Sequence, residues 1–154
     1  ARTKPPLVCG KISIQFISNL HLLATPTQKI NTAKSMLMIS TPEATAMDLL
    51  KFPEQAGGIN HIATVLTELC ENIQPNKLRT LLDNQTEIAW MQRLGFLFEL
   101  LGEHELALIV KQQLSLQKRV DYIPLVTPLK QSDEKISRNT AWKIMINATV
   151  ESDI

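Results

Sequence analysis

Residues 86–101 constrain the fold most, because this stretch is apolar almost all the way round a helix. Within 88–101 only Gln92, Arg93 and Glu99 interrupt a run of large apolar side chains. A helix that is apolar on every side has to be surrounded by other elements. Gly95 within it leaves room for a close neighbour. The stretch therefore predicts the central buried helix of a helical core.

A second helix has a clearly marked start near residue 41. Ser40 or Thr41 can cap the first free amides, and Pro42 suits a first turn. Glu43 stands three residues after Ser40, the spacing of a capping box. Pro53 predicts that this helix ends by residue 52.

Three further segments have the apolar stripe of an amphipathic helix, and these predict helices at 60–73, 75–82 and 103–116. The pair at 57–58 is Gly-Gly, which separates the first of them from the helix before it. We therefore expect about five helices.

Strand signals lie towards both ends of the chain. Apolar and polar residues alternate over 11–17 and 142–148, and 36–39 is a short apolar run. The polar stretch 130–139 is typical of a loop. We expect an α+β fold, in which short strands from the two ends pair in one small sheet packed on a central bundle of about five helices.

Charge is segregated along the chain although the net charge is only +1. Residues 1–42 carry five basic side chains and no carboxylate, whereas residues 43–110 have a net charge of −6. The low total argues against a chain whose main role is to hold nucleic acid. Scattered solubilising lysines would explain the basic segment, but it also supplies three candidate contacts for a partner or for phosphate: Lys11, Lys29 and Lys34.

Two charged residues stand in apolar surroundings, namely Asp48 and Arg93. A buried charge is tolerated mainly when it is paired. We expect one or both to find a charged or backbone partner inside the fold, in a structural role or a functional one.

Motifs for catalysis are missing, since the sequence has no GxxxxGK[ST], GxGxxG, GxSxG or HExxH. The three histidines, at 21, 61 and 104, lack the spacing of metal ligands on one helix face. We therefore expect no catalytic residue, no metal and no cofactor. No apolar run approaches the ~20 residues of a membrane span. Cys70 falls in an apolar stripe, which favours a buried thiol and a reducing compartment.

Three blocks carry a resemblance to a known family: STPEATAMDLLKF at 40–52, GGINHIATVLTEL at 57–69 and WMQRLGFLFELLG at 90–102. In order and separation they resemble the C-terminal domain of AbiEi-type antitoxins, from type IV toxin–antitoxin systems linked to abortive infection of bacteria by phage. The domain would span 11–150 after a flexible start at 1–10. The positions that match the family motif include Ser40, Thr41, Pro42, Glu43 and Trp90.

The resemblance implies a non-enzymatic, cytoplasmic antitoxin and transcriptional regulator. It would counteract an AbiEii-type nucleotidyltransferase toxin and support autoregulation of its promoter, with a homodimer as a candidate assembly. A winged-helix domain that binds operator DNA would lie upstream, outside these 154 residues. Type IV antagonism does not require a stable complex, so direct contact with the toxin stays open. The alternative is a nucleic-acid-binding accessory module that uses the basic N-terminal sheet; an uncharacterised enzyme is the least supported reading.

Overall fold

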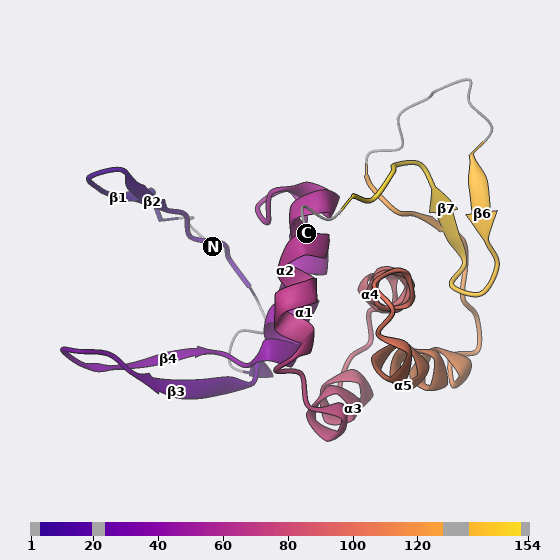
Figure 1. The fold of residues 1–154 in the computed structure, drawn as a ribbon, viewed down its shortest axis with the longest axis horizontal. Helices are drawn as coiled ribbons and strands as arrows, with labels where there is room; N and C mark the ends of the chain where they lie inside the picture. The colour runs from indigo at the N-terminus through magenta and orange to yellow at the C-terminus, as the bar shows by residue number, and fades with distance from the viewer. Residues whose placement is uncertain (1–3, 20–23, 128–135, 152–154) are drawn as a thin grey trace.

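A computed structural model describes residues 4–19, 24–127 and 136–151. Helices form the body of the molecule, and small sheets lie on either side of it (Figure 1). The described residues contain five helices: α1 (Pro42–Lys51), α2 (Gly58–Cys70), α3 (Pro75–Asp83), α4 (Ala89–Leu100) and α5 (His104–Ser115). The predicted α+β class is confirmed.

Helix α4 is the centre of the core. It packs against α1 on one side and against α5 and the C-terminal sheet on others. Trp90, Met91, Leu94, Leu97 and Phe98 are all buried in it. Full burial of such a side chain is worth about 1.5–3 kcal/mol, so this helix contributes strongly to the stability of the fold. The prediction of a central buried helix is confirmed. None of the helices in the described residues has the length and apolar character needed to cross a membrane.

The start of α1 follows the sequence signals with one difference. Thr41 is the N-cap, and its hydroxyl accepts a hydrogen bond from the Ala44 N–H at 3.3 Å. The expected capping box between Ser40 and Glu43 is wrong, because the Glu43 carboxylate is used elsewhere. Its Oε1 accepts a hydrogen bond from the backbone N–H of Gln74 at 2.8 Å, just before α3 begins. Glu43 therefore ties the start of α1 to the start of α3.

The strands are short and form three separate sheets. Two are antiparallel hairpins, which pair β1 (Leu7–Cys9) with β2 (Ile12–Ile14) and β3 (Thr27–Asn31) with β4 (Met36–Ser40). The third has the order β5-β7-β6, from β5 (Ile123–Pro124), β6 (Ser137–Asn139) and β7 (Ile144–Ile146). In it β7 is parallel to β5 and antiparallel to β6.

Two sequence expectations about the ends of the chain are wrong. The N- and C-terminal strands do not pair, because β2 pairs with β1 and β7 with β5 and β6. The segment 1–10, expected to be a flexible start, contains β1, which Gly10 connects to β2 by a tight turn at φ 61°; its flexibility stays a prediction. The supposed loop at 130–139 contains β6, which pairs with β7. Residues 1–3 and 130–135 of these expectations lie outside the described residues.

Candidate functional site

Two hairpins project from the helical body on the side away from α4 and α5 (Figure 1). The β1–β2 hairpin turns at Gly10 and Lys11. The β3–β4 hairpin turns between Thr32 and Ser35, where the Thr32 N–H donates to the Ser35 carbonyl at 2.8 Å and the Ser35 N–H donates to the Thr32 hydroxyl at 3.0 Å. Except at the end of β4, where the chain enters α1, the β3–β4 hairpin lies apart from the helices (Figure 1).

The β1–β2 hairpin has one apolar face. Its register pairs Leu7 with Ile14 and Cys9 with Ile12, and residues paired directly across two strands share a face. All four side chains are exposed, Ile12 by as much as 66%. Val8 points to the opposite face, because successive side chains of a strand alternate.

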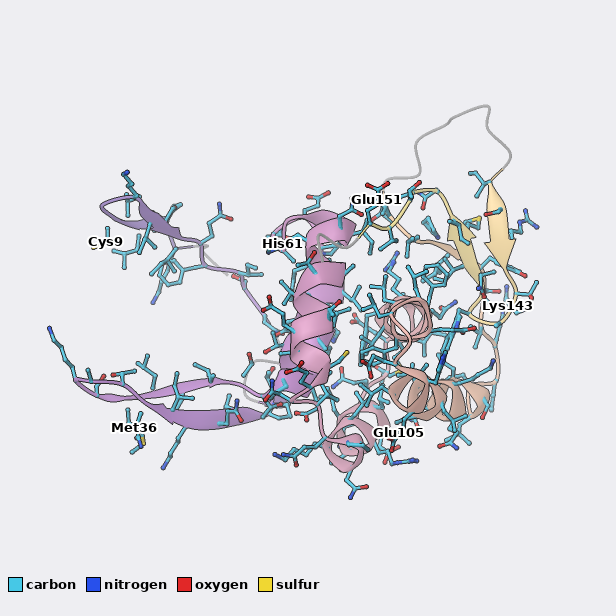
Figure 2. All side chains as sticks on the ribbon, in the orientation of Figure 1. Cys9, Met36, His61, Glu105, Lys143 and Glu151 are labelled. Atoms are coloured by element: carbon cyan, nitrogen blue, oxygen red, sulfur yellow. The ribbon has the colours of Figure 1, made fainter. Side chains whose placement is uncertain are left out.

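The β3–β4 hairpin is apolar on both faces. Ile30 pairs with Leu37, and Ile39 stands on the same face two residues further along β4. Met36 and Met38 occupy the other face, and Lys29 is the cross-strand partner of Met38. Each of these apolar side chains is exposed, Met36 by 58%. Figure 2 shows Cys9 and Met36 on the hairpins, well away from the helices.

The alternation at 11–17 predicted a half-buried strand, and this part of the prediction is wrong. The alternation is present, but nothing in the described residues covers its apolar face. Two-stranded hairpins are at best marginally stable alone, and large exposed apolar patches mark interaction sites. We call the following exposed side chains the hairpin surface, and take it as the candidate partner-binding site: Leu7, Cys9, Ile12, Ile14, Ile30, Met36, Leu37, Met38 and Ile39.

The lysines selected from the sequence all lie on these hairpins. Lys11 is in the β1–β2 turn, Lys34 is in the β3–β4 turn, and Lys29 is on β3. All three are exposed. Because residues 1–42 contain no carboxylate, the charged side chains on the two hairpins are all basic. The structure thus spreads the three lysines over two hairpins, and their role in binding stays a prediction.

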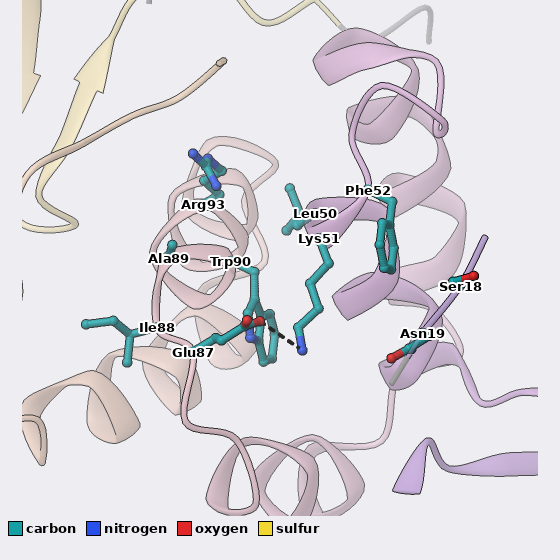
Figure 3. Close-up of a pocket in the computed structure, with 10 residues that line it drawn as sticks. All are labelled: Ser18, Asn19, Leu50, Lys51, Phe52, Glu87, Ile88, Ala89, Trp90 and Arg93. Atoms are coloured by element: carbon teal, nitrogen blue, oxygen red, sulfur yellow. Dashed lines mark ion pairs between the residues drawn. The ribbon is translucent and has the colours of Figure 1, made fainter. Parts of the chain in front are cut away.

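A pocket of about 610 Å³ lies between α1 and the start of α4, beside residues 18–19 (Figure 3). Lys51 from α1 reaches across it, with Nζ 3.3 Å from Glu87 Oε2 and 5.9 Å from the centroid of the Trp90 ring. Lys51 also donates to Gln85 Oε1 at 3.1 Å. Lys51 and Glu87 therefore neutralise each other, which suits a packing contact between α1 and α4 better than catalysis.

The polar residues of α4 hold the C-terminal sheet. Arg93 donates from Nη2 to the Pro124 carbonyl at 3.0 Å and from Nε to the Leu125 carbonyl at 3.1 Å. Gln92, only 1% exposed, points its Nε2 at the carbonyls of Asp121 and Trp142, at 2.9 and 3.1 Å. Arg93 has the backbone partners expected of a buried charge. Sequence reasoning did not select Gln92, although it was one of only three polar interruptions in this helix.

Asp48 differs from Arg93, because its Oδ1 is buried without a hydrogen-bond partner. Burial raises the pKa of the Asp48 carboxyl above its ordinary value of 3.8, and the charge of Lys51 opposes this shift only in part. Asp48 lines a mostly apolar pocket of about 280 Å³ with Ile17 and Phe52. Within the part of the chain that the structure describes, no charged side chain forms an ion pair with Asp48.

Among the described residues, no group of three or more His, Cys, Asp or Glu side chains could hold a metal ion. His61 and His104 are exposed, and His21 lies outside the described residues. The cysteines are free thiols, Cys9 exposed and Cys70 buried. Burial, with a smaller effect from Glu103, raises the pKa of the Cys70 thiol to about 12, so it is a poor nucleophile.

Comparison with protein families identifies the chain. A family model described as the AbiEi antitoxin C-terminal domain matches residues 1–100. The chain belongs to this antitoxin family. No curated protein and no solved structure matches it. Family membership gives the chain an antitoxin role in a toxin–antitoxin system, and the family is not a known enzyme family.

The matched part of this AbiEi antitoxin domain contains both hairpins and α1–α4. The motif positions quoted above lie at the junction of β4 with α1 and in α4. Ser40 and Thr45 share a hydrogen bond between their hydroxyls at 2.7 Å, and Trp90 is only 2% exposed. In the antitoxin domain these residues therefore hold the base of the β3–β4 hairpin and the core, whereas the exposed surface lies further out on the hairpins.

Proposed function

We propose that this antitoxin domain counteracts a cognate nucleotidyltransferase toxin in the cytoplasm and supports autoregulation of its promoter, acting without catalysis. We further propose that the hairpin surface is the part of the domain required for antagonism. Family membership supports the antitoxin role. The observation that carries the choice of surface is the uncovered apolar face of Leu7, Cys9, Ile12 and Ile14.

Growth rescue tests this proposal, because antagonism of this type does not require a stable complex with the toxin. The toxin is expressed with the wild-type chain or with the double variant Ile12→Asn/Ile14→Asn. The wild-type chain is expected to restore growth and the double variant to lose most of that rescue. Val8→Asn is the matched control, since Val8 is equally exposed but lies on the opposite face of the hairpin.

Both variants should keep the helical circular dichroism spectrum of the wild type, because these hairpin residues lie outside the buried core. Full rescue by the double variant would show that the hairpin surface is not required for antagonism. Failure of the wild-type chain itself to rescue would refute the antitoxin role of these 154 residues.

A nucleic-acid-binding accessory role is the second candidate, and the absence of carboxylates from residues 1–42 favours it. The test is titration of random-sequence duplex DNA at several salt concentrations. If the hairpins contact phosphate, the triple variant Lys11→Glu/Lys29→Glu/Lys34→Glu should bind more weakly. The slope of log affinity against log salt should also fall by about 0.9 for each phosphate that the variant no longer neutralises.

Lys118→Glu serves as the control for this titration, since Lys118 is exposed just after α5, which lies across the helical body from the hairpins (Figure 1). Equal affinity and an equal salt slope for the triple variant and the wild type would exclude phosphate binding by these lysines.

A further inference from the structure

The pocket between α1 and the start of α4 is lined by a hydrogen-bond donor that has no acceptor. Trp90 is only 2% exposed, and within the described residues its indole Nε1 is buried without a hydrogen-bond partner. An unpaired buried donor costs free energy, and most such groups are paired with protein or with a bound group. Trp90 lines this pocket of about 610 Å³. Its N–H therefore favours an acceptor that comes from outside the chain.

The N-terminus of α4 lies at the same pocket and supplies further donors. Its first residues, Ala89 and Trp90, line the pocket together with its N-cap, Ile88. Ile88 has no side-chain acceptor, so no side-chain hydrogen bond of the N-cap serves the first amides of α4. These amides have no partner within the helix, and together with the helix dipole they attract anions. The pocket is thus suited to an acceptor that carries negative charge.

Lys51 adds a positive charge at this end of the pocket. Its Nζ lies 5.9 Å from the centroid of the Trp90 ring and 3.3 Å from Glu87 Oε2, and Figure 3 shows the three side chains together. The Lys51 side chain is 16% exposed, whereas that of Glu87 is 70% exposed. An ion pair with one partner so open to water is weak. Glu87 can therefore turn out of the pocket and leave the Lys51 charge to another anion.

The Glu87 carboxylate serves these donors only in part. It pairs with Lys51, but the Trp90 N–H remains without an acceptor. A phosphate group carries more acceptor oxygens than a carboxylate, so it can accept from an ammonium group, an indole N–H and helix amides together. The pocket also has room for an organic stem, since pockets for small molecules hold about 300–1,000 Å³. Leu50 and Phe52 supply apolar walls.

We propose that this pocket binds a phosphate group, carried by a small organic ester, and that Glu87 turns out into the solvent to admit it. Lys51 Nζ, the Trp90 indole N–H and the first amides of α4 donate to the phosphate oxygens, and the stem of the ester lies against Leu50 and Phe52. The binding goes beyond the antitoxin role and does not involve the hairpin surface. It can therefore fail while growth rescue succeeds, and the reverse.

Nuclear magnetic resonance of the indole N–H groups tests the site. The protein has two tryptophans, and the Trp142 N–H already donates to the Glu99 carboxylate. The ¹⁵N-labelled chain is titrated with phenyl phosphate, with inorganic phosphate or with sodium chloride at matched ionic strength. Phenyl phosphate should shift the Trp90 signal until it saturates and leave the Trp142 signal in place, whereas chloride should give no saturable shift. Trp90→Phe assigns the signals, because it removes one of them.

Two further probes define the ligand. Inorganic phosphate should bind several-fold more weakly than phenyl phosphate, because it has no stem to contact the apolar walls. Equal affinity would assign the site to the free ion and overturn the ester. Benzoate has the same ring with a carboxylate in place of the phosphate, and it should also bind several-fold more weakly. Benzoate binding as tight as that of phenyl phosphate would overturn the choice of phosphate.

Charge variants identify the residues that act. Glu87→Gln removes the competing carboxylate and should raise the affinity for phenyl phosphate several-fold, whereas Lys51→Gln should lower it several-fold. Glu68→Gln is the matched control and should leave the affinity unchanged, because Glu68 is exposed on α2, a fully described helix from which no residue lines the pocket. Urea unfolding checks that each variant is folded.

The result for Glu87→Gln decides the proposal even if Lys51→Gln does not fold, because Glu87 is exposed and its variant should gain affinity rather than lose it. If neither the wild type nor Glu87→Gln shows a saturable shift of the Trp90 signal with either phosphate probe, the proposal is overturned. Weaker binding by Glu87→Gln than by the wild type would refute the displacement of Glu87.

Discussion

The indole ring of Trp142 lies directly against the backbone of Gly95 in the middle of α4. A Cβ atom built on Gly95 would come within 2.0 Å of the Trp142 Cζ3 atom. Trp142 is only 1% exposed, and its indole N–H donates a hydrogen bond to the carboxylate of Glu99, one turn further along α4. The contact thus joins the central helix to the turn that precedes β7.

Gly95→Ala should destabilise the protein, although alanine is normally favoured over glycine inside a helix by about 1 kcal/mol. The added methyl group meets a ring that has no room to move, and overpacking of this kind costs about 1–3 kcal/mol. The measurement is the free energy of unfolding in urea. In the background Trp142→Leu, the same Gly95→Ala change should cost less or become favourable. If Gly95→Ala stabilised the protein in the wild-type background, the close packing of Trp142 on Gly95 would be contradicted.

Glu43→Ala should cost about 1.5–3 kcal/mol of unfolding free energy, because the Gln74 N–H loses a charged acceptor. Glu43 is 1% exposed, so water cannot readily replace the missing carboxylate. Glu43→Gln is the control: it retains an acceptor oxygen and should lose clearly less. Equal losses for the two variants would mean that the hydrogen bond between Glu43 and Gln74 contributes little.

Arg93→Lys should loosen the C-terminal sheet. A single ammonium group cannot reproduce the hydrogen bonds that the Arg93 guanidinium donates to the carbonyls of Pro124 and Leu125. We expect a loss of about 1.5–3 kcal/mol. Hydrogen exchange should accelerate at the Leu125 amide, which donates to the Met145 carbonyl at 3.0 Å. Arg79→Lys, at an exposed site on α3, is the control, and its exchange profile should match the wild type. If hydrogen exchange at the Leu125 amide is unchanged in Arg93→Lys, then Arg93 does not stabilise the C-terminal sheet.

Asp48→Asn should raise the melting temperature at pH 7. Because burial raises the folded-state pKa of Asp48, the ionised carboxyl is disfavoured in the folded protein and the protonated form is not. The folded state thus loses stability relative to the unfolded one as pH rises through the raised pKa. The advantage of Asn should therefore shrink as pH falls from the raised pKa towards 3.8, and it should be lost below 3.8, where both states are protonated.

Melting curves of Asp48→Asn and wild type between pH 3 and 7 measure this difference. Glu68→Gln, at an exposed site on α2, should show no comparable trend. A melting temperature for Asp48→Asn that lies below the wild type at pH 7 would mean that the Asp48 carboxylate is stabilising after all.

The helices were predictable because their signals are local. Thr41 as a cap, Pro53 as a stop and the all-apolar run through Trp90 each act within a few residues, and the five helices lie close to the predicted ranges. Strand β3 was missed, because Ile30 is the only large apolar residue in Thr27–Asn31 and no alternation marks it. The short strands β5 and β6 depend mainly on β7 and on the anchor at Arg93, which sequence patterns do not show.

The partners of buried polar groups were also beyond prediction. Glu43 has a spacing that suits a local capping box, but its acceptor oxygen serves an amide 31 residues away. The basic character of the hairpins was evident from the sequence, including Lys11, Lys29 and Lys34. Their open apolar faces were not, because alternation shows which residues share a face and not whether anything covers that face.

The position of α4 in the core has a consequence for how the molecule can be divided. The match to the antitoxin family ends at residue 100, which is also the last residue of α4. Yet α4 owes its burial to α5 and to Trp142, which both come later in the chain. A fragment cut at residue 100 would leave faces of α4 that belong in the interior open to water. The stretch by which this family is recognised is therefore shorter than the smallest piece of this protein that we expect to fold on its own.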